Sequence, residues 1–360
     1  MPSKPLRKRL RKRFTKAFTK KRCAITTIRD VAERAGVSIT TVSHILNDTR
    51  HVSDALRTRV EKAMDELDYT PNALARGLRQ KQTRTLGIIV PDSANPYFAE
   101  VARGVEDACF AQGYSVILCN SDSDPEKESM YINVLAEKQV DGICLVAAST
   151  QTIETHLDAA PKLQTPMVLI DREYPKTIVD TVVVENTKGA VKAIEHLLSL
   201  GHRRIGCITG LPDLLNSKKR SDGYRQAIQE AGLIVDESLV IEGDFQYEGG
   251  YEATKQLLAL DNPPTAVFAC NDLMAIGAIS AVISAGLSVP KDISIVGFDD
   301  IHLAVFANPS LTTIVQPKHE MGVTAAEILL NRLSDSTLKP NRYQLKTQLL
   351  IRDSTTAVSP

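Results

Sequence analysis

Residues 86–355 alternate short apolar runs with amphipathic stretches of helix length, and this alternation constrains the fold more than any other feature of the chain. Strand–helix alternation predicts parallel sheets that are covered by helices on both faces. A segment of about 270 residues is large for a single sheet, so we expect two similar lobes. The expected strands are Leu86–Val90, Ser115–Cys119, Gly142–Ala147, Met167–Ile170, Thr181–Val184, Ile205–Thr209, Ala266–Ala269 and Ile293–Val296, and the expected helices include Ala99–Gln112, Lys188–Leu200, Lys218–Glu230 and Leu273–Ala285.

Glycine marks the ends of these four helices. Gly113, Gly201, Gly232 and Gly286 stand just after amphipathic stretches, where a helix commonly ends in the left-handed backbone that glycine adopts without strain. Ligands of such folds bind at the carboxyl ends of the strands and between lobes. The residues that follow each strand are therefore the first candidates for a binding site.

Polar and aromatic side chains follow several of the strands. Carboxylate, amide and guanidinium groups offer paired donors and acceptors for the hydroxyls of a sugar ring, and aromatic faces can cover its apolar side. The set fits a neutral polyol better than a nucleotide, although any single Asp or Asn, Asp272 above all, can instead cap a helix. The predicted ligand-binding residues are Asn95, Tyr97, Phe98, Asp171, Arg172, Arg220, Phe245, Asn271, Asp299 and Gln316.

The net charge of zero conceals a basic front end on an acidic body. Residues 1–25 carry eleven Lys and Arg and no acid, whereas residues 86–360 carry 22 basic and 35 acidic residues. This asymmetry predicts that the front end meets a polyanion. One interpretation of the tail over residues 1–24 is that it adds phosphate contacts. We favour the other two, a misassigned start or a disordered, solvated run.

Residues 26–47 (TTIRDVAERAGVSITTVSHILN) predict two short helices joined by a tight turn. Thr26 or Thr27 caps the first helix, Gly36 ends it, and Ser38 caps the second. A turn of about four residues with Gly is the spacing of a DNA-binding helix-turn-helix, although an ordinary helical hairpin has it too. The second helix would place its first residues at base edges of the major groove. The exposed candidates are Ile39, Thr40, Thr41, Ser43 and His44.

A third helix, expected over Asp54–Leu67, precedes the segment Pro71–Leu78 (PNALARGL). This segment is too short for a stable isolated helix, so it folds only against a partner such as DNA or a second copy of the chain. An exposed Leu78 fits a wedge into a minor-groove base step. A plain linker with one stray leucine is the alternative, and the segment taken alone favours it.

Several classes of protein are disfavoured by what the sequence lacks. No apolar run approaches the ~20 residues of a membrane span, and no apolar stretch of a secretory signal follows the basic start. Phosphate-loop, dinucleotide-binding and metalloprotease motifs are absent, so we expect no enzyme, no catalytic residue, no cofactor and no metal. We expect the bacterial cytoplasm, at the nucleoid. The cysteines form no C-x-x-C pair and are interpreted as buried small hydrophobes in a reducing compartment: Cys23, Cys109, Cys119, Cys144, Cys207 and Cys270.

With these segments in view, the chain resembles the lactose-repressor/galactose-repressor (LacI/GalR) family of bacterial transcription regulators. The likeness covers about residues 26–355, with the motifs in the family's order. The segments that carry it are Thr27–Asn47, Val52–Ser53, Tyr69–Leu78, Leu86–Pro91, Asn95–Phe98, Gly201–Gly210, Pro264–Gly277, Val296–Asp300 and Leu311–Gln316.

The resemblance implies an N-terminal all-α helix-turn-helix head with a hinge helix, followed by an α/β two-lobed effector domain like the type I periplasmic binding proteins. It implies that residues 39, 40 and 44 read bases of a pseudo-palindromic operator, that residues 71–78 form the hinge helix and that Leu78 is its wedge. His44 stands where many members carry Arg. The predicted DNA-contacting set is Thr27, Ser38, Ile39, Thr40, Thr41, Ser43, His44, Asn47, Asn72, Ala75 and Leu78.

The expected domains follow from the same comparison. They are a basic tail over 1–24, a DNA-binding domain over 25–70, a hinge helix and linker over 71–85, and an effector domain over 86–356. Within the effector domain, the N-lobe comprises about residues 86–185 and 316–343, and the C-lobe about 186–313 and 344–356. Because no leucine-heptad tail is found, we expect a homodimer rather than a tetramer.

The ligand-binding set is also similar to that of ribose-type periplasmic binding proteins. Ala147–Ala148 depart from that pattern, because such pockets often hold a polar residue there, and the departure weakens the case for ribose. We therefore expect a DNA-binding repressor controlled by a small sugar, with ribose or another pentose first. The alternatives are a catabolite-control regulator with a phosphoprotein or sugar-phosphate effector and, more remotely, a sugar-uptake binding protein.

Overall fold

The computed structural model describes residues 26–47, 50–69, 82–153, 155, 165–173 and 178–358. The chain forms two compact units, residues 1–81 and 82–360, and we call their described parts the head and the body. The predictions for the basic tail, for Cys23 and for the hinge helix with Asn72, Ala75 and Leu78 lie outside the described residues.

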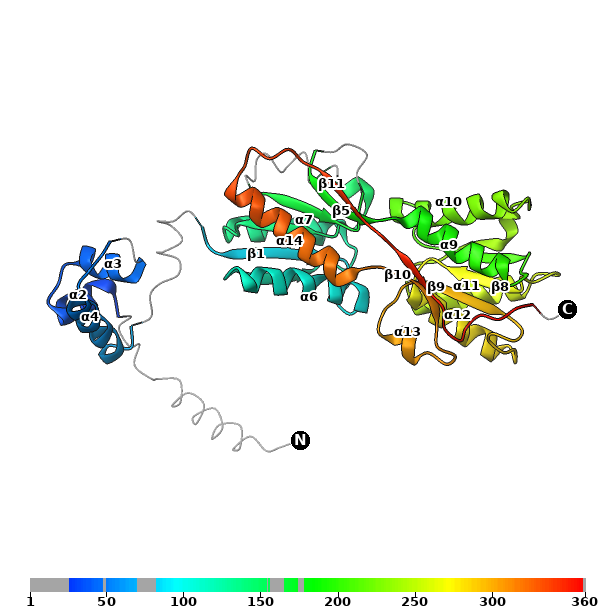
Figure 1. Ribbon diagram of the computed structural model, residues 1–360, viewed down its shortest axis with the longest axis horizontal. Coiled ribbons are helices and arrows are strands. Elements are labelled where there is room, and N and C mark those ends of the chain that lie inside the picture. Colours follow the sequence, from blue (N-terminus) through cyan, green and yellow to red (C-terminus); the bar gives the residue numbers. More distant parts are fainter. Residues whose placement is uncertain are drawn as a thin grey trace, which may run out of the picture. The chain divides into compact units, whose positions relative to one another are not determined.

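The described part of the head consists of helices α2 (Ile28–Ala35), α3 (Ile39–Asn47) and α4 (Asp54–Glu66) (Figure 1). One apolar cluster joins them, with Val31, Val42 and Val60 fully buried at its centre. At the end of α2, Gly36 has a φ of 65°, the left-handed conformation that turns the chain into α3. The expected helix-turn-helix and third helix are confirmed.

Side chains at the helix starts satisfy backbone donors that the helices leave unpaired. The carboxylate of Asp30 accepts hydrogen bonds from the Thr27 N–H and hydroxyl at 2.7 and 2.8 Å, which lowers the pKa of Asp30. At the start of α3, the Ser38 hydroxyl accepts from the Thr41 N–H at 3.0 Å. These bonds set where the two helices begin, and so where the residues of α3 face outward.

Two six-stranded sheets of matching strand order form the body in its described residues (Figure 1). All neighbouring strands in them are parallel except β10 and β12, which are antiparallel. The first sheet has the order β11 (Arg342–Leu345), β5 (Asp180–Val184), β4 (Met167–Ile170), β3 (Gly142–Leu145), β1 (Thr85–Val90) and β2 (Ser115–Asn120). The second has the order β12 (Gln348–Leu350), β10 (Thr312–Val315), β9 (Ser294–Asp299), β8 (Ala266–Ala269), β6 (Ile205–Thr209) and β7 (Val240–Glu242).

Helices cover both faces of each sheet. On the first sheet, α6 (Pro96–Ala111) and α14 (Lys318–Ser334) share one core cluster, and α7 (Pro125–Glu137) packs into another. The second sheet is flanked by two helix pairs, α9 (Asn186–Ser199) with α10 (Leu215–Glu230), and α11 (Tyr247–Leu258) with α12 (Asp272–Ser284). A short α13 (Leu303–Phe306) follows β9, and a 3-10 turn (Glu237–Leu239) precedes β7. We call each sheet with its helices the first and the second lobe.

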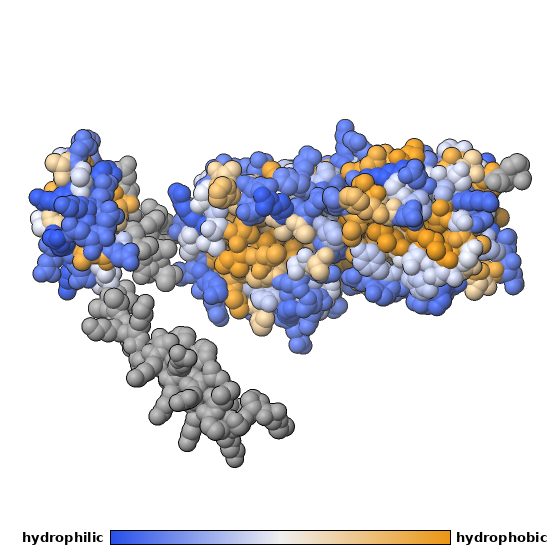
Figure 2. All heavy atoms as spheres, turned by 90° about the horizontal axis from the view of Figure 1, so that it is seen from below, coloured by the Kyte–Doolittle hydropathy of each residue, from blue (hydrophilic) through white to orange (hydrophobic). Residues whose placement is uncertain are grey.

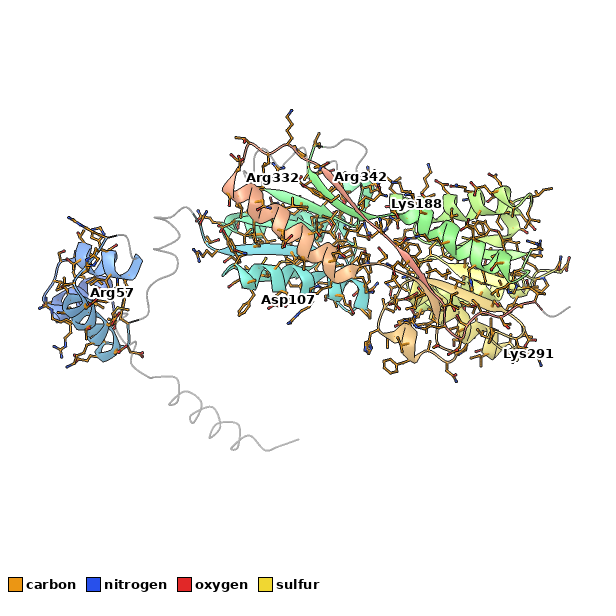
Figure 3. All side chains as sticks on the ribbon, viewed as in Figure 1. Arg57, Asp107, Lys188, Lys291, Arg332 and Arg342 are labelled. Carbon is orange, nitrogen blue, oxygen red and sulfur yellow. The ribbon has the colours of Figure 1, made fainter. Side chains whose placement is uncertain are left out.

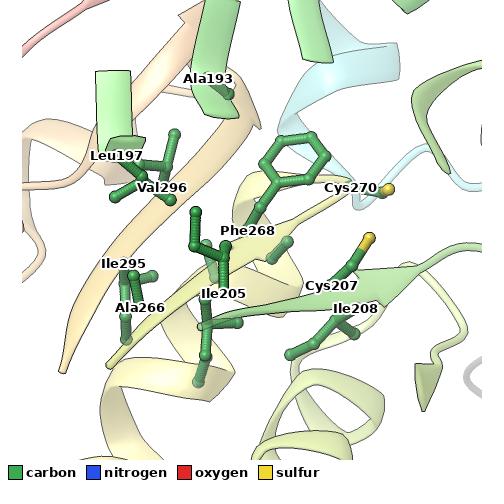
Figure 4. Packing of buried hydrophobic residues seen from close by; sticks show 14 of the residues in the cluster. Ala193, Leu197, Ile205, Cys207, Ile208, Ala266, Phe268, Cys270, Ile295 and Val296 are labelled. Atoms are coloured by element: carbon green, nitrogen blue, oxygen red, sulfur yellow. The ribbon is translucent and has the colours of Figure 1, made fainter. Parts of the chain in front are cut away.

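The core of the second lobe is apolar from sheet to helices. In Figure 4, Phe268 of β8 lies among the side chains of neighbouring strands and of α9, and the sulfur of Cys207 points toward Cys270. The five described cysteines are free and buried, as expected. Burial raises the pKa of Cys144, whose thiol is fully enclosed in the first lobe.

The chain passes between the lobes three times, from β5 to α9, from β10 to α14 and from β11 to β12. The expected two-lobed α/β architecture is confirmed. The boundary expected near residue 343 falls within β11, which pairs with β5 of the first sheet. No helix in the described part of the chain is long and apolar enough to cross a membrane.

Candidate functional sites

The helix-turn-helix presents a polar and partly apolar surface at the start of α3. Ser38, Ile39 and Thr40 are exposed, and Ile39 is 39% accessible although it is a large hydrophobic residue. Thr41, Ser43 and His44 are half-buried, and Thr27 is exposed at the start of α2. Asn47 ends α3, and its side chain lies outside the described residues.

Packing of α3 explains this pattern. Val42 and Ile45 point into the head core, so residues 39, 40 and 44 lie on other sides of the helix. The Thr41 hydroxyl lies 2.9 Å from the Ser38 hydroxyl, so it already has a partner within the cap. The side chains best placed for contact outside the head are therefore Ile39 and Thr40.

In the body, a cavity lies between the carboxyl ends of the two sheets. It encloses about 570 Å³, including space that is open to solvent. Both lobes contribute walls, and nine of the ten predicted ligand-binding residues line it: Asn95, Tyr97, Phe98, Asp171, Arg172, Arg220, Phe245, Asn271 and Asp299. The expectation that binding residues follow strands, which we call the strand-end rule, thus picks out residues that the fold brings together from as far as 204 positions apart in the sequence.

Asp171 follows β4, and its two carboxylate oxygens differ in their hydrogen bonds. Its Oδ2 accepts hydrogen bonds from Arg172 and, at 3.2 Å, from the amide of Asn216. Its Oδ1 is buried and has no hydrogen-bond partner within the described residues. An unpaired buried carboxylate oxygen is costly, so this position calls for a donor that the protein itself does not supply.

Asp299 ends β9 on the opposite side of the cavity. Its Oδ1 accepts from the Gln316 amide at 2.6 Å and lies 3.5 Å from the Arg220 guanidinium. Burial raises the pKa of Asp299 to about 7, although the positive charge of Arg220 opposes this shift. The residue has a φ of 122°, a conformation that L side chains rarely adopt, so the surrounding structure holds this carboxyl in place.

Arg220 and Arg172 are held just as firmly. The Arg220 guanidinium donates to the Asn186 side chain at 2.8 Å and to the Cys270 carbonyl at 2.6 Å, and lies 3.9 Å from the Phe298 ring centroid. Arg172 donates to the Ala147 carbonyl at 2.9 Å and lies 5.9 Å from the ring of Phe98. Both arginines are nearly fully buried and preorganised.

Aromatic rings form another part of the wall. Tyr97 and Phe98 meet edge to face, with ring centroids 5.1 Å apart. The pKa of Tyr97 is raised well above its usual value, first by burial and then by the charges of Asp171 and Asp299. Phe245 lies half-buried on the second lobe with a φ of 65°. These rings offer apolar faces beside the carboxylates.

The two asparagines of the set also serve as helix caps. Asn95 accepts from the Tyr97 N–H at 3.0 Å at the start of α6, and Asn271 accepts from the Met274 N–H at 2.9 Å at the start of α12. The residue that caps α12 is therefore Asn271. Asp272, for which the sequence left a helix cap as the alternative to ligand binding, does not cap this helix. Asp272 is buried behind the cavity and accepts from the Ile301 N–H at 2.8 Å.

Gln316 is the one predicted residue that is not on the cavity wall. It lies behind Asp299, where its amide donates to that carboxylate and its Oε1 accepts from the Tyr97 hydroxyl at 3.3 Å. Sequence reasoning missed nine further lining residues. All but Asn216, which lies within α10, come within a few residues of a strand end, where the strand-end rule could have found them. They are Pro91, Asp92, Ser123, Ala148, Leu211, Leu214, Asn216, Asp244 and Gln246.

Known protein families match both units. Residues 27–72 match the model of bacterial regulatory proteins of the lacI family, and residues 194–355 match a periplasmic binding protein-like domain. Among curated relatives, the ribose operon repressor of Escherichia coli K12 is 41% identical over 92% of this chain and all of its own length. The transcriptional repressor PurR of Photobacterium profundum is 41% identical over 92% of this chain and 98% of its own.

Solved structures agree with these relatives. The lac repressor dimer bound to operator and an anti-inducer has a TM-score of 0.84 at 30% identity, covering 92% of this chain and 99% of its own. A lacI family regulator from Enterococcus faecium with bound ribose has a TM-score of 0.68 at 33% identity, covering 76% of this chain and all of its own.

Proposed function

The chain belongs to the lacI family of bacterial regulatory proteins, and from this premise we propose that it is a repressor whose operator affinity is set by a small sugar, ribose first and another pentose next. As a member of this family it is a DNA-binding transcriptional regulator, and the family consists of regulators rather than enzymes. The sugar, its binding residues and the assembly are our proposals.

The unpaired Oδ1 of Asp171 is the observation that carries the sugar proposal. A ligand hydroxyl would donate to this oxygen and remove the cost of leaving it buried and unpaired. Asp299 offers a second carboxyl across the cavity, and Arg220 and Arg172 offer donors to the ring and hydroxyl oxygens. Tyr97, Phe98 and Phe245 would cover the apolar side of the ring.

The same geometry favours a neutral sugar over a phosphorylated one. A phosphate group placed beside Asp171 would bring negative charge next to that carboxylate, and its oxygens at neutral pH are mainly acceptors, so it would give Oδ1 of Asp171 no donor. The similarity to the ribose operon repressor and to the ribose-bound regulator supports a pentose. The relative named PurR is equally similar, so the proposal must also be tested against ligands that are not sugars.

On DNA, we propose that α3 enters the major groove with Ile39, Thr40 and His44 at base edges, flanked by Thr27, Ser38, Thr41, Ser43 and Asn47. Residues 71–78 would form the hinge helix, with Asn72, Ala75 and Leu78 at the minor groove. Two copies would read a pseudo-palindrome. Apolar side chains exposed on the body surface, Phe110, Leu118, Leu303, Val305 and Phe306 among them, support such a homodimer, and Figure 2 shows apolar patches on the body.

Sugar binding would favour one arrangement of the two lobes, and so bias the hinge helices and heads toward or away from the operator. Such coupling typically amounts to ~1–3 kcal/mol. We would measure anisotropy of a labelled duplex, selected from random DNA by the full-length chain, with and without D-ribose. A change in operator affinity of at least 5-fold is expected. No change with D-ribose or any other free sugar would overturn the proposal.

A further inference from the structure

The two lobes touch on two sides of the cavity, and the contacts are apolar on one side and polar on the other. On one side, Leu273 of α12 and Ile301 after β9 belong to the second lobe but are buried in the core cluster of the first. Separating these residues would expose apolar surface to water. This side therefore stays together when the lobes move.

The other side is polar. The N-terminal half of α10 faces the end of β4, where Asn216 donates to Asp171 and Lys219 forms an ion pair with Glu173. Nearby, the Thr150 hydroxyl donates to the Asp213 carbonyl at 2.7 Å, again between lobes. Polar groups of this kind exchange their partners for water at little cost, so this is the side on which the cavity can open.

Glu173 is the buried centre of the polar side. Its side chain is only 4% exposed, and its Oε2 contacts two cations, Lys219 of the second lobe and Arg342 of β11 in the first lobe. The Arg342 nitrogen lies 2.8 Å from that oxygen (the labelled Arg342 appears on β11 in Figure 3). One carboxylate thus has one partner in its own lobe and one in the other.

This division of partners makes a reversible contact. A buried carboxylate that loses its only cation is strongly destabilised. Here Arg342 stays with Glu173 when the lobes part, and Lys219, 28% exposed, can be hydrated at once. Opening therefore breaks a single ion pair and leaves no unpaired charge. Neither Glu173 nor Lys219 lines the cavity, so the pair acts on closure without touching a ligand.

We propose that the Lys219–Glu173 ion pair is an interlobe latch that sets the effector affinity by stabilising the closed cavity. Lys219 and Glu173 are then positioning residues. The inference rests on the proposed function for its effector, but the latch itself is a property of the ligand-free body. The apparent affinity of a ligand that binds only the closed form falls in proportion to the fraction of molecules that are closed.

Two matched variants of the full-length chain test whether the contact between lobes, or only the neutralisation of the Glu173 charge, affects ligand binding. Lys219→Met removes the interlobe partner of Glu173 and keeps Arg342, whereas Arg342→Met removes the partner within the lobe and keeps the latch. By calorimetric titration with D-ribose, Lys219→Met should weaken binding about 10-fold and Arg342→Met less than 2-fold. Lys219→Arg should restore affinity to within 2-fold of the unmodified chain. Circular dichroism melting checks that each variant folds.

A second measurement needs no ligand. Spin labels at Met130→Cys on α7 and Gln229→Cys on α10 report the distance between the lobes, in a Cys23→Ser background because the five described cysteines are buried. Pulsed dipolar spectroscopy should show a larger share of long distances in Lys219→Met than in Arg342→Met or the unmodified sequence.

The outcomes distinguish the two proposals. If D-ribose fails to bind but Lys219→Met still opens the lobes, the latch stands and the proposed sugar falls. If D-ribose binds and Lys219→Met changes neither affinity nor distance, the latch is overturned. If Arg342→Met has the same effect as Lys219→Met, compensation of the Glu173 charge explains the result and the latch is again overturned.

Discussion

The head and the body place their candidate binding residues in opposite environments. In the head, Ile39 and Thr40 stand exposed on a helix whose other side supplies a small core. In the body, nine of the ten predicted ligand-binding residues are buried, with Phe245 half-buried. A surface that meets DNA keeps its side chains available, whereas a cavity for a small ligand fixes them beforehand through its own hydrogen bonds.

Because of this difference, binding and folding stability depend on different residues in the head and on shared residues in the body. Substitutions on the exposed side of α3 should alter binding with little effect on folding. Substitutions at Asp171, Asp299 or Arg220 disturb buried hydrogen bonds of the folded body as well as the cavity wall, so they change both stability and binding.

Removing residues 1–81 should separate the two functions completely. The truncated chain keeps the body intact, because the hydrogen bonds of Thr83 and Arg84 to Asp141 are retained. We expect operator affinity to fall at least 1,000-fold in anisotropy titrations, to the level of non-specific binding. D-ribose affinity should stay within 2-fold of the full-length value. Survival of operator binding would refute the assignment of DNA recognition to the head.

Asp171→Asn should weaken D-ribose binding about 100-fold, because the substitution replaces the acceptor that lacks a partner with a neutral amide. Calorimetry measures the loss, and Asp222→Asn on the exposed side of α10 is the control. Equal affinities of the two variants for D-ribose would show that Asp171 does not contact the ligand.

In the head, Thr40→Ala should reduce specific operator binding about 10-fold and leave non-specific binding unchanged, because an exposed base-reading side chain is lost. Thr58→Ala on α4 makes the same chemical change at another exposed position of the head. Unfolding of the head should be unaffected by either change. A matching loss in both variants would argue against base contact by Thr40.

D-ribose affinity should fall about 5-fold from pH 8 to pH 6, with a midpoint near the pKa of about 7 of Asp299. A sugar hydroxyl that donates to this carboxyl favours the ionised form, so protonation opposes binding. The raised pKa of Asp299 means that its protonation stabilises the folded, ligand-free body. This stabilisation is complete below pH ~4 and is lost as the pH rises through about 7. Asp299→Asn should remove the pH dependence, and affinity that rises on acidification would contradict the assignment.

The sequence predicted the two sites to different degrees for physical reasons. The helix-turn-helix depends on local signals, namely the apolar period of α2 and α3, the caps Thr27 and Ser38, and the left-handed Gly36. All four glycine helix ends have positive φ in the structure, as expected. Local chemistry of this kind is readable because it does not depend on distant partners.

The elements that sequence reasoning missed are defined by distant partners. The short strands β7, β11 and β12 have little apolar periodicity and exist because they pair at the edges of sheets. Strand β3 ends at Leu145, earlier than expected, because Arg172 and Glu128 bond the backbone of Ala147 and Ala148. Asn216 and the ion pair of Lys219 with Glu173 came from neither periodicity nor the strand-end rule, since both arise from contact between lobes.

Thermal melting of the full-length chain with D-ribose, D-ribose 5-phosphate and a purine base tests whether the body binds a free sugar. A ligand at 100 times its dissociation constant stabilises the folded state by ~2.7 kcal/mol, which a melting curve resolves easily. We expect that D-ribose raises the melting temperature of the body and that the phosphate ester and the base do not. A shift with the phosphate ester or the base, and none with D-ribose or any other free sugar, would contradict it.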